Sequence, residues 1–128
     1  MVGWGPWPTP KAGDEARGRL VTVVLPGAYG KPRPALVIQS DLFDEHPSVT
    51  ILPITGARRA SALFRIDVLP SVANGLHKPS QVMVDKAQGM PRDRLEDTIG
   101  GLEDHALLLV TRALAVFLGI AWGGFWRA

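Results

Sequence analysis

One arginine, Arg33, stands between Pro32 and Pro34 at the start of an apolar run that covers residues 35–38. Each proline fixes its own φ and biases the residue before it towards an extended backbone. We therefore expect Arg33 on a stiff entry to a β-strand. A guanidinium keeps its charge at neutral pH and can donate two parallel hydrogen bonds to the oxygens of one phosphate. An arginine at this position is therefore suited to phosphate recognition. Taken alone, the segment favours an ordinary surface arginine at a strand end.

The composition is that of a globular protein that can bury a core. Of the 128 residues, 46% are hydrophobic and 20% are charged, and this length suggests one domain. There is no cysteine, which excludes disulfides and thiolate metal sites and fits the reducing cytoplasm, where we expect the protein. His46, His77 and His105 lie far apart, without the paired spacing of a zinc site. The sequence therefore predicts no metal site and no cofactor.

Basic residues are concentrated in the first three quarters of the chain. Residues 17–94 hold 11 Lys and Arg against 6 Asp and Glu, a net charge of +5, whereas residues 95–128 hold 2 against 4, a net charge of −2. The basic excess falls on the part whose pattern predicts β-structure. This distribution favours an anionic partner such as nucleic acid.

Short segments rich in β-branched residues, separated by Gly and Pro, predict a mainly β fold. The predicted strands cover residues 20–25, 35–38, 49–54, 63–69 and 81–85. The first two are expected to form a hairpin, and Asn74-Gly75 marks another turn. Residues 91–98 predict a short helical or turn segment.

The last apolar segment predicts one long helix over residues 103–120, with acidic residues in its first turn and Gly119 at its end. Residues 106–126 are numerous enough to span a bilayer, but Arg112 would be costly in lipid and glycines break the second half. We therefore expect a buried helix and no membrane partner. Together the segments predict an α+β, mainly β chain that forms a small, strongly bent barrel closed by one helix.

Several segments together resemble the MazF/PemK family of toxins from type II toxin–antitoxin modules. The similarity runs in order through Arg17-Gly18, residues 21–27, residues 31–41, Pro53-Ile54-Thr55, residues 74–76, residues 80–86 and residues 113–119. It covers residues 17–121, so residues 1–16 would be an irregular extension and residues 122–128 a C-terminal tail. The resemblance implies an SH3-like small barrel of the CcdB/MazF/PemK type, a homodimer, and a cognate antitoxin as partner.

The resemblance also implies an activity, the sequence-specific and metal-independent cleavage of single-stranded mRNA. The ribose 2′-OH attacks the adjacent phosphorus and leaves a 2′,3′-cyclic phosphate and a 5′-OH end. Such a reaction needs a base for the 2′-OH, a donor for the leaving oxygen, and positive charge at the phosphorane oxygens. The 2′-OH would also distinguish RNA from DNA as the substrate.

The positions that match the family motifs imply Arg33, Thr55 and Asp85 as catalytic residues. Arg33 would stabilise the charge of the transition state, Thr55 would bond a phosphate oxygen or orient the 2′-OH, and Asp85 would act as general base or hold Arg33. From the residues alone, Thr55 is a turn-forming threonine, and Asp85 is as readily a strand-end cap. The base and the acid stay open, because Met83 and Gly56 stand where some members carry Arg and Ser.

A groove for single-stranded RNA needs aromatic rings for stacking and cations for the backbone. The candidates are Tyr29, Lys31, Arg58, Arg59, Phe64, Arg65 and Lys86. For Phe64, packing in the core is the stronger interpretation. His77 and Lys78 follow a turn and are expected to be solvated.

Two other functions stay open on the same fold. A CcdB-like gyrase poison would act by protein binding alone, and a degenerate member would bind RNA or antitoxin without cleaving. The set of Arg33, Thr55 and Asp85 favours the nuclease, because a gyrase poison needs no phosphate-cleaving cluster.

Overall fold

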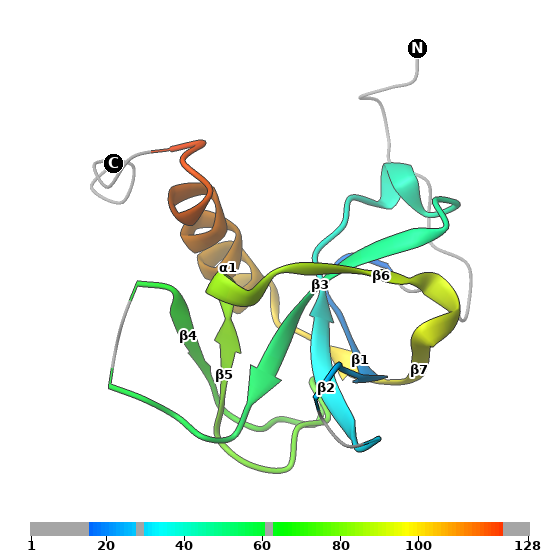
Figure 1. Cartoon of the computed structure of the whole chain (residues 1–128). Coiled ribbons are helices and arrows are strands. Elements are labelled where there is room, and N and C mark those ends of the chain that lie inside the picture. The colour runs from blue at the N-terminus through cyan, green and yellow to red at the C-terminus, as the bar shows by residue number, and fades with distance from the viewer. Residues whose placement is uncertain (1–15, 28–29, 61–62, 122–128) are drawn as a thin grey trace.

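The computed structural model describes residues 16–27, 30–60 and 63–121, in which seven β-strands form one antiparallel sheet and an α-helix packs against it (Figure 1). The strands are β1 (Arg19–Val24), β2 (Pro32–Val37), β3 (Ser48–Thr55), β4 (Arg65–Val68), β5 (Ser80–Met83), β6 (Gln88–Pro91) and β7 (Leu95–Gly101), and the helix is α1 (Asp104–Phe117). Three 3-10 turns join them: η1 (Asp41–Phe43), η2 (Val84–Lys86) and η3 (Arg92–Arg94). Tyr29, the predicted tail and all but the last residue of the predicted N-terminal extension lie outside the described residues.

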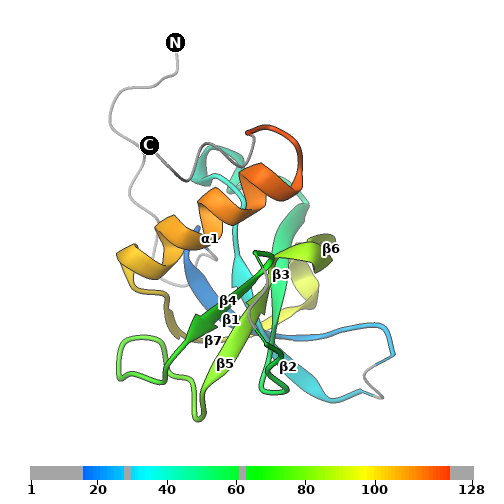
Figure 2. The same ribbon diagram turned by 90° about the vertical axis from the view of Figure 1, so that its left-hand side faces the viewer.

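The long strand β3 organises the sheet. One edge of β3 pairs with β2, while its other edge pairs first with β6 and then, through Ile54 and Thr55, with β5. The strand order is β4-β5-β3-β2-β1-β7, with β6 beside β3. Because two strands share one edge of β3, the sheet bends there into two parts (Figures 1 and 2). The predicted fold class, a mainly β, barrel-like chain with a C-terminal helix, is confirmed.

Alternating side chains along the strands fill two hydrophobic cores, one on each face of the sheet. The first core includes Leu20, Leu36, Leu52, Val82 and Val84, and the second includes the neighbouring Val21, Val37, Ile51 and Met90. The helix α1 covers the first core and contributes Val110 and Ala113 to it. Burying one side chain of the size of Val or Leu stabilises the fold by about 1.5–3 kcal/mol.

The helix α1 is shorter than predicted. It covers Asp104–Phe117 and is followed by Gly119, whose φ of 76° is the left-handed conformation that commonly ends a helix. The prediction that the helix ends near Gly119 is confirmed. The expectation of a buried helix is wrong in part, because only Val110 and Ala113 of α1 are buried. In the described ranges, no helix combines the length and the hydropathy needed to cross a membrane.

Arg17 fixes the helix to the sheet. Its guanidinium donates hydrogen bonds to the Ile38 carbonyl and, at 2.6 Å, to Thr111 Oγ1 on α1. Its backbone N–H donates to the Asp41 carboxylate at 2.8 Å. Partial burial lowers the pKa of the Arg17 guanidinium, and the nearby Asp41 charge offsets part of that shift. This cation therefore serves the packing of the helix.

Two predicted segments are wrong in part. The predicted strand over residues 81–85 ends at Met83, and the chain continues as the 3-10 turn η2. The turn is needed because the pairing on β3 shifts by three residues between Ile54↔Val82 and Ile51↔Gln88. The predicted helical segment over residues 91–98 is helical only in η3, and the following residues form β7, an edge strand with few buried side chains.

Candidate active site

Arg33 lies where β2 separates from β3. Within β2, Arg33 pairs with Val23 of β1, but the pairing with β3 begins only at Ala35, opposite Pro53. Pro32, Pro34 and Pro53 have no N–H to donate, so the β2–β3 ladder cannot continue past this point. The exposed guanidinium of Arg33 is therefore mounted on a stiff segment beside an opening in the sheet.

Thr55 is the last residue of β3, on the other side of this opening. Its hydroxyl oxygen accepts a hydrogen bond from the Ala57 N–H at 3.0 Å. A hydroxyl that accepts in this way keeps its own proton for another partner. Thr55 is thus both a turn-forming threonine, as the residues alone indicated, and an available donor.

A cleft of about 700 Å³ joins the two residues. It is lined by the ends of β2 and β3, by the β1–β2 hairpin at Pro26 and Gly27, and by the loop after β4 at His77 and Lys78. No carboxylate of the described residues lines it. In the same part of the chain, no three His, Cys, Asp or Glu side chains gather as metal ligands. The cleft is therefore suited to bind an anion through protein cations and hydroxyls.

The loop between β4 and β5 is held by the buried side chain of Asn74. Its Oδ1 accepts from the N–H groups of Ser71 and Leu76, and its Nδ2 donates to the Leu69 carbonyl and to Glu103. The hydrogen bond from Ser71 Oγ is the main cause of a lowered pKa for the Glu103 carboxyl. Four hydrogen bonds to one buried amide fix the path of the loop that carries His77 and Lys78 to the cleft.

Gly75 allows this loop to lie directly on β7. Its φ is +70°, and a Cβ atom at this position would lie 2.1 Å from the carbonyl oxygen of Ile99. Gly100 of β7 is similarly close to the backbone of Ala73 and Asn74. Only residues without a side chain fit at these two positions, so the loop has one position relative to the sheet.

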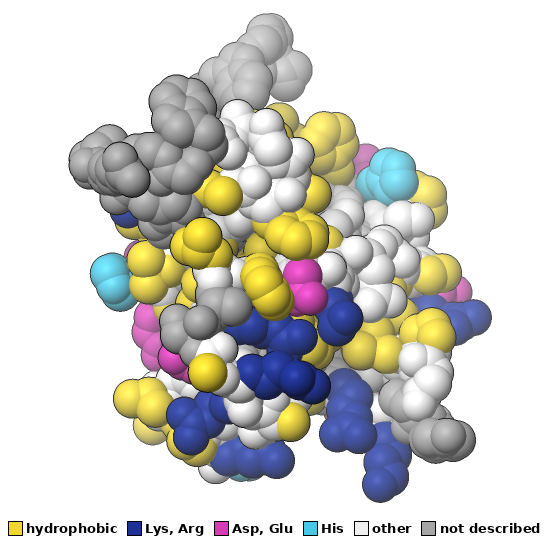
Figure 3. Space-filling view, turned by 60° about the vertical axis from the view of Figure 1, so that its left-hand side comes forward, with side chains coloured by type: hydrophobic (Ala, Val, Ile, Leu, Met, Phe, Trp, Pro, Cys, Tyr) yellow, Lys and Arg dark blue, Asp and Glu magenta, His cyan; other side chains and the backbone are white. Residues whose placement is uncertain are grey.

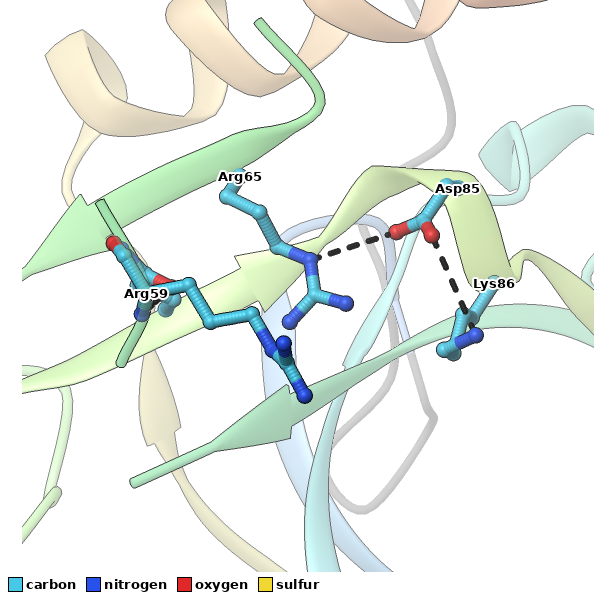
Figure 4. A network of polar contacts seen from close by, with 5 residues as sticks. Arg59, Arg65, Asp85 and Lys86 are labelled. Carbon is cyan, nitrogen blue, oxygen red and sulfur yellow. Dashed lines mark hydrogen bonds and ion pairs between the residues drawn. The ribbon is translucent and has the colours of Figure 1, made fainter. Parts of the chain in front are cut away.

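Asp85 is not among the residues that line the cleft. It belongs to η2, and its carboxylate lies 3.4 Å from Arg65 Nε and 3.9 Å from Lys86 Nζ (Figure 4). The expectation that Asp85 holds Arg33 is therefore wrong, because the cations that it pairs with are Arg65 and Lys86. The role of Asp85 as general base stays a prediction. Its position outside the cleft does not favour that role.

Arg65 and Lys86, which pair with Asp85, form a second group of cations together with Arg59, here called the β4–β5 patch (Figure 4). The backbone of Arg59 is fixed by the buried Gln81 amide, which exchanges hydrogen bonds of 2.9–3.0 Å with it. A space-filling view of this side shows Lys and Arg gathered beside exposed hydrophobic side chains (Figure 3). The patch offers a positive surface in addition to the cleft.

The other predicted RNA-binding residues divide between these surfaces. Arg58 is exposed in the loop between Thr55 and the β4–β5 patch, and Lys31 is exposed just before β2. Phe64 is 38% exposed, with its ring 6.5 Å from that of Phe117 and 5.9 Å from the Arg65 guanidinium carbon. Its assignment to the core is therefore wrong, and its ring is available for contact.

Sequence reasoning missed His77 and Lys78 as part of the cleft. They were expected to be solvated, and both are exposed, but they line the same cleft as Arg33. Two signals were present in the sequence: Gly56 in place of the Ser of some relatives, and a basic residue just after the Asn74-Gly75 turn.

Comparison with known proteins identifies the family of the chain. Residues 9–118 match the family described as PemK-like, MazF-like toxin of type II toxin–antitoxin system. A protein named probable endoribonuclease MazF, from Mycolicibacterium smegmatis, is 44% identical over 106 residues, which are 82% of this chain and 97% of that protein. This match supports the endoribonuclease over a CcdB-like poison or a degenerate member.

Solved structures show the same fold. The Mycobacterium tuberculosis toxin MazF-mt6 has a TM-score of 0.69 and 27% identity, and the match covers 81% of this chain and 99% of that one. An endoribonuclease in complex with its cognate antitoxin, from a mycobacterial species, has a TM-score of 0.71 and 23% identity, with coverage of 84% and 97%. The family match, the 44% identity and the shared fold together show that the chain belongs to the PemK-like, MazF-like toxins of type II toxin–antitoxin systems.

Proposed function

We propose that this protein is the toxin of a type II toxin–antitoxin module and cleaves single-stranded mRNA in the cytoplasm by attack of the ribose 2′-OH. The observation that carries the proposal is the cleft that contains Arg33 and Thr55. Among the described residues, it is lined by cations and by no carboxylate. The 44% identical relative that bears the name of an endoribonuclease supports the same activity.

The residues of the cleft have distinct roles in this mechanism. Arg33 binds the equatorial oxygens of the phosphorane and stabilises the charge that develops there, because a guanidinium presents paired donors to a phosphate. Thr55 donates a hydrogen bond to a non-bridging oxygen or orients the attacking 2′-OH. The bond from the 2′-oxygen to phosphorus forms while the bond from phosphorus to the 5′-oxygen breaks. The 2′-OH loses one proton to a base and the 5′-oxygen gains one from an acid, so the products are a 2′,3′-cyclic phosphate and a 5′-OH.

The protein's own cations are expected to supply the charge that the reaction needs. We therefore predict that the purified protein cuts single-stranded RNA in the presence of EDTA. The products should be separated and their ends mapped on a long natural RNA, which also yields the cleavage motif. A DNA of the same sequence is the matched control and should stay intact. Strict dependence on added Mg²⁺ or Mn²⁺, or equal cutting of DNA, would contradict the proposal.

The flanking RNA would follow the exposed cations away from the cleft. Arg58, Arg59 and Arg65 follow Thr55 closely along the chain, and Phe64 offers a ring beside Arg65 for base stacking. Lys31 lies on the Arg33 side. This arrangement gives the backbone of a single strand positive charge on both sides of the scissile phosphate.

A homodimer and a cognate antitoxin are the proposed protein partners. Around the end of α1, Phe117, Leu118 and Ile120 are at least half exposed, and Leu63 lies exposed next to Phe64. A group of apolar side chains of this kind marks a contact surface. An antitoxin with an acidic tail would occupy the same cations as RNA and so compete with it.

We predict that light scattering of the free protein reports twice its 13.8 kDa mass. Phe117→Asp should lower the mass towards that of the monomer, because it places a charge in the apolar contact. Val72→Asp is the matched control, since Val72 is fully exposed on the β4–β5 loop. A monomer at micromolar concentration, with RNA still bound in excess antitoxin, would rule out this arrangement.

A further inference from the structure

Lys78 lies directly over Gly56 at the edge of the cleft. A Cβ atom added to Gly56 would lie 2.2 Å from Lys78 Cε and 2.7 Å from Lys78 Nζ. Gly56 is the residue after Thr55, so the ammonium group of Lys78 is next to the proposed reaction site. The loop held by Asn74 brings it there, and the following Pro79 restricts the backbone of Lys78 to extended conformations.

The glycine at position 56 is explained by this contact and not by its backbone. The glycines with positive φ in the described residues are Gly18, Gly27, Gly30, Gly75 and Gly119, and Gly56 is not one of them. Any residue could adopt its backbone conformation. What glycine provides here is room, and Lys78 fills the room.

The charge of Lys78 has no protein partner in the described part of the chain. No ion pair to its ammonium group is present there, and no described carboxylate lines the cleft. Arg33 lines the same cleft, so two like charges face one hollow. Such an arrangement costs free energy unless an anion lies between the charges, and a nucleic acid backbone is that kind of anion.

We propose that Lys78 is a second phosphate-binding residue of the cleft, and that Gly56 is the position that lets its ammonium group lie beside Thr55. The inference rests on the proposed function, because it assumes that RNA enters this cleft. Lys78 contacts a backbone phosphate of bound RNA, whereas Arg33 acts on the phosphate that reacts. Lys78 therefore contributes mainly to RNA affinity, and its loss should raise KM more than it lowers kcat.

The test compares Lys78→Ala, Gly56→Ala and the double variant. Gly56→Ala should leave the fold intact, because the atoms it displaces are the flexible end of an exposed side chain. Two variants serve as controls: Gly89→Ala adds a methyl group in open space on β6, and Arg94→Ala removes a cation that does not line the cleft. Thermal unfolding of each variant checks the fold.

Binding is measured with an oligoribonucleotide that carries the mapped cleavage site and a 2′-O-methyl group on the attacking nucleotide, so that it stays uncut. Lys78→Ala should weaken binding about tenfold, as expected for one charge-assisted phosphate contact. The slope of log K against log salt should become shallower by about 0.7, the value for one phosphate contact of a single strand. Gly56→Ala should do the same by displacing the ammonium group.

The double variant decides whether the two positions act together. If Gly56 acts only through Lys78, the double variant binds no more weakly than Lys78→Ala alone. The inference would be overturned if Lys78→Ala left the RNA affinity and the salt slope unchanged. It would also be overturned if the fold-losses of affinity in the two single variants multiplied in the double variant. Wild-type protein that fails to cut RNA would instead overturn the proposed function, so the two failures are distinguishable.

Discussion

Arg33→Ala is expected to lower the rate of RNA cleavage about a hundredfold while the fold survives. One preorganised charge contact to a transition state is worth about 3 kcal/mol, which corresponds to this factor. The fold should survive because the Arg33 side chain is exposed and belongs to neither hydrophobic core. The loss should appear in kcat, measured under saturating RNA, since the contact strengthens as the phosphorane forms.

Arg33→Lys tests the nature of the same contact. Lysine keeps the charge but is a point charge on a flexible stem, so it cannot reproduce the fork that a guanidinium presents to two oxygens. We expect poor rescue, well below a tenth of the wild-type rate. Arg94→Ala should cleave like the wild type, because Arg94 does not line the cleft. A folded Arg33→Ala protein with full activity would place the site elsewhere.

Gly75→Ala is expected to cost about 2–5 kcal/mol of the free energy of unfolding. The left-handed φ of +70° costs a residue with a side chain about 1–2 kcal/mol, and the new methyl group would also meet the Ile99 backbone, which adds about 1–3 kcal/mol. The neighbour is a carbonyl of β7 and not the end of a side chain, so relief requires a shift of the whole loop. Urea unfolding gives the free energy directly.

The variant Gly119→Ala separates the cost of the left-handed backbone from the cost of the steric contact. Its φ of +76° is nearly the same, but nothing lies within 4 Å of the position that a Cβ atom would take. It should therefore lose only the conformational part, about 1–2 kcal/mol. Equal losses in Gly75→Ala and Gly119→Ala would mean that the close approach of the loop to β7 contributes nothing to stability.

The stiff, extended backbone segment that carries Arg33 could be predicted from the sequence because its causes are local. Two prolines around one arginine fix an extended backbone wherever that segment lies, and β-branched runs on either side of a turn favour a hairpin. The long helix was recognised for the same reason, since its apolar positions and Gly119 lie within one continuous segment. The fold class followed from these elements and from the resemblance to a family.

The surroundings of Asp85 and Lys78 could not be predicted because their causes are distant in the sequence. Asp85 leaves the strand because β5 and β6 share one edge of β3 out of register, which no property of residues 81–85 reveals. Lys78 reaches the cleft only because Asn74 and Gly75 press their loop against β7. The strand β7 itself was missed because none of its residues is fully buried and they show no clear alternation.

The central claim is that the 2′-OH of the RNA is the nucleophile in the cleft of Arg33 and Thr55. The most direct measurement uses an oligoribonucleotide with one 2′-deoxy nucleotide at the mapped cleavage site, incubated with the protein in EDTA. We predict that the all-ribose strand is cut and carries a 2′,3′-cyclic phosphate, whereas the strand with the single deoxy nucleotide stays intact at that bond. Cleavage of the deoxy-substituted strand at the same bond would contradict the claim.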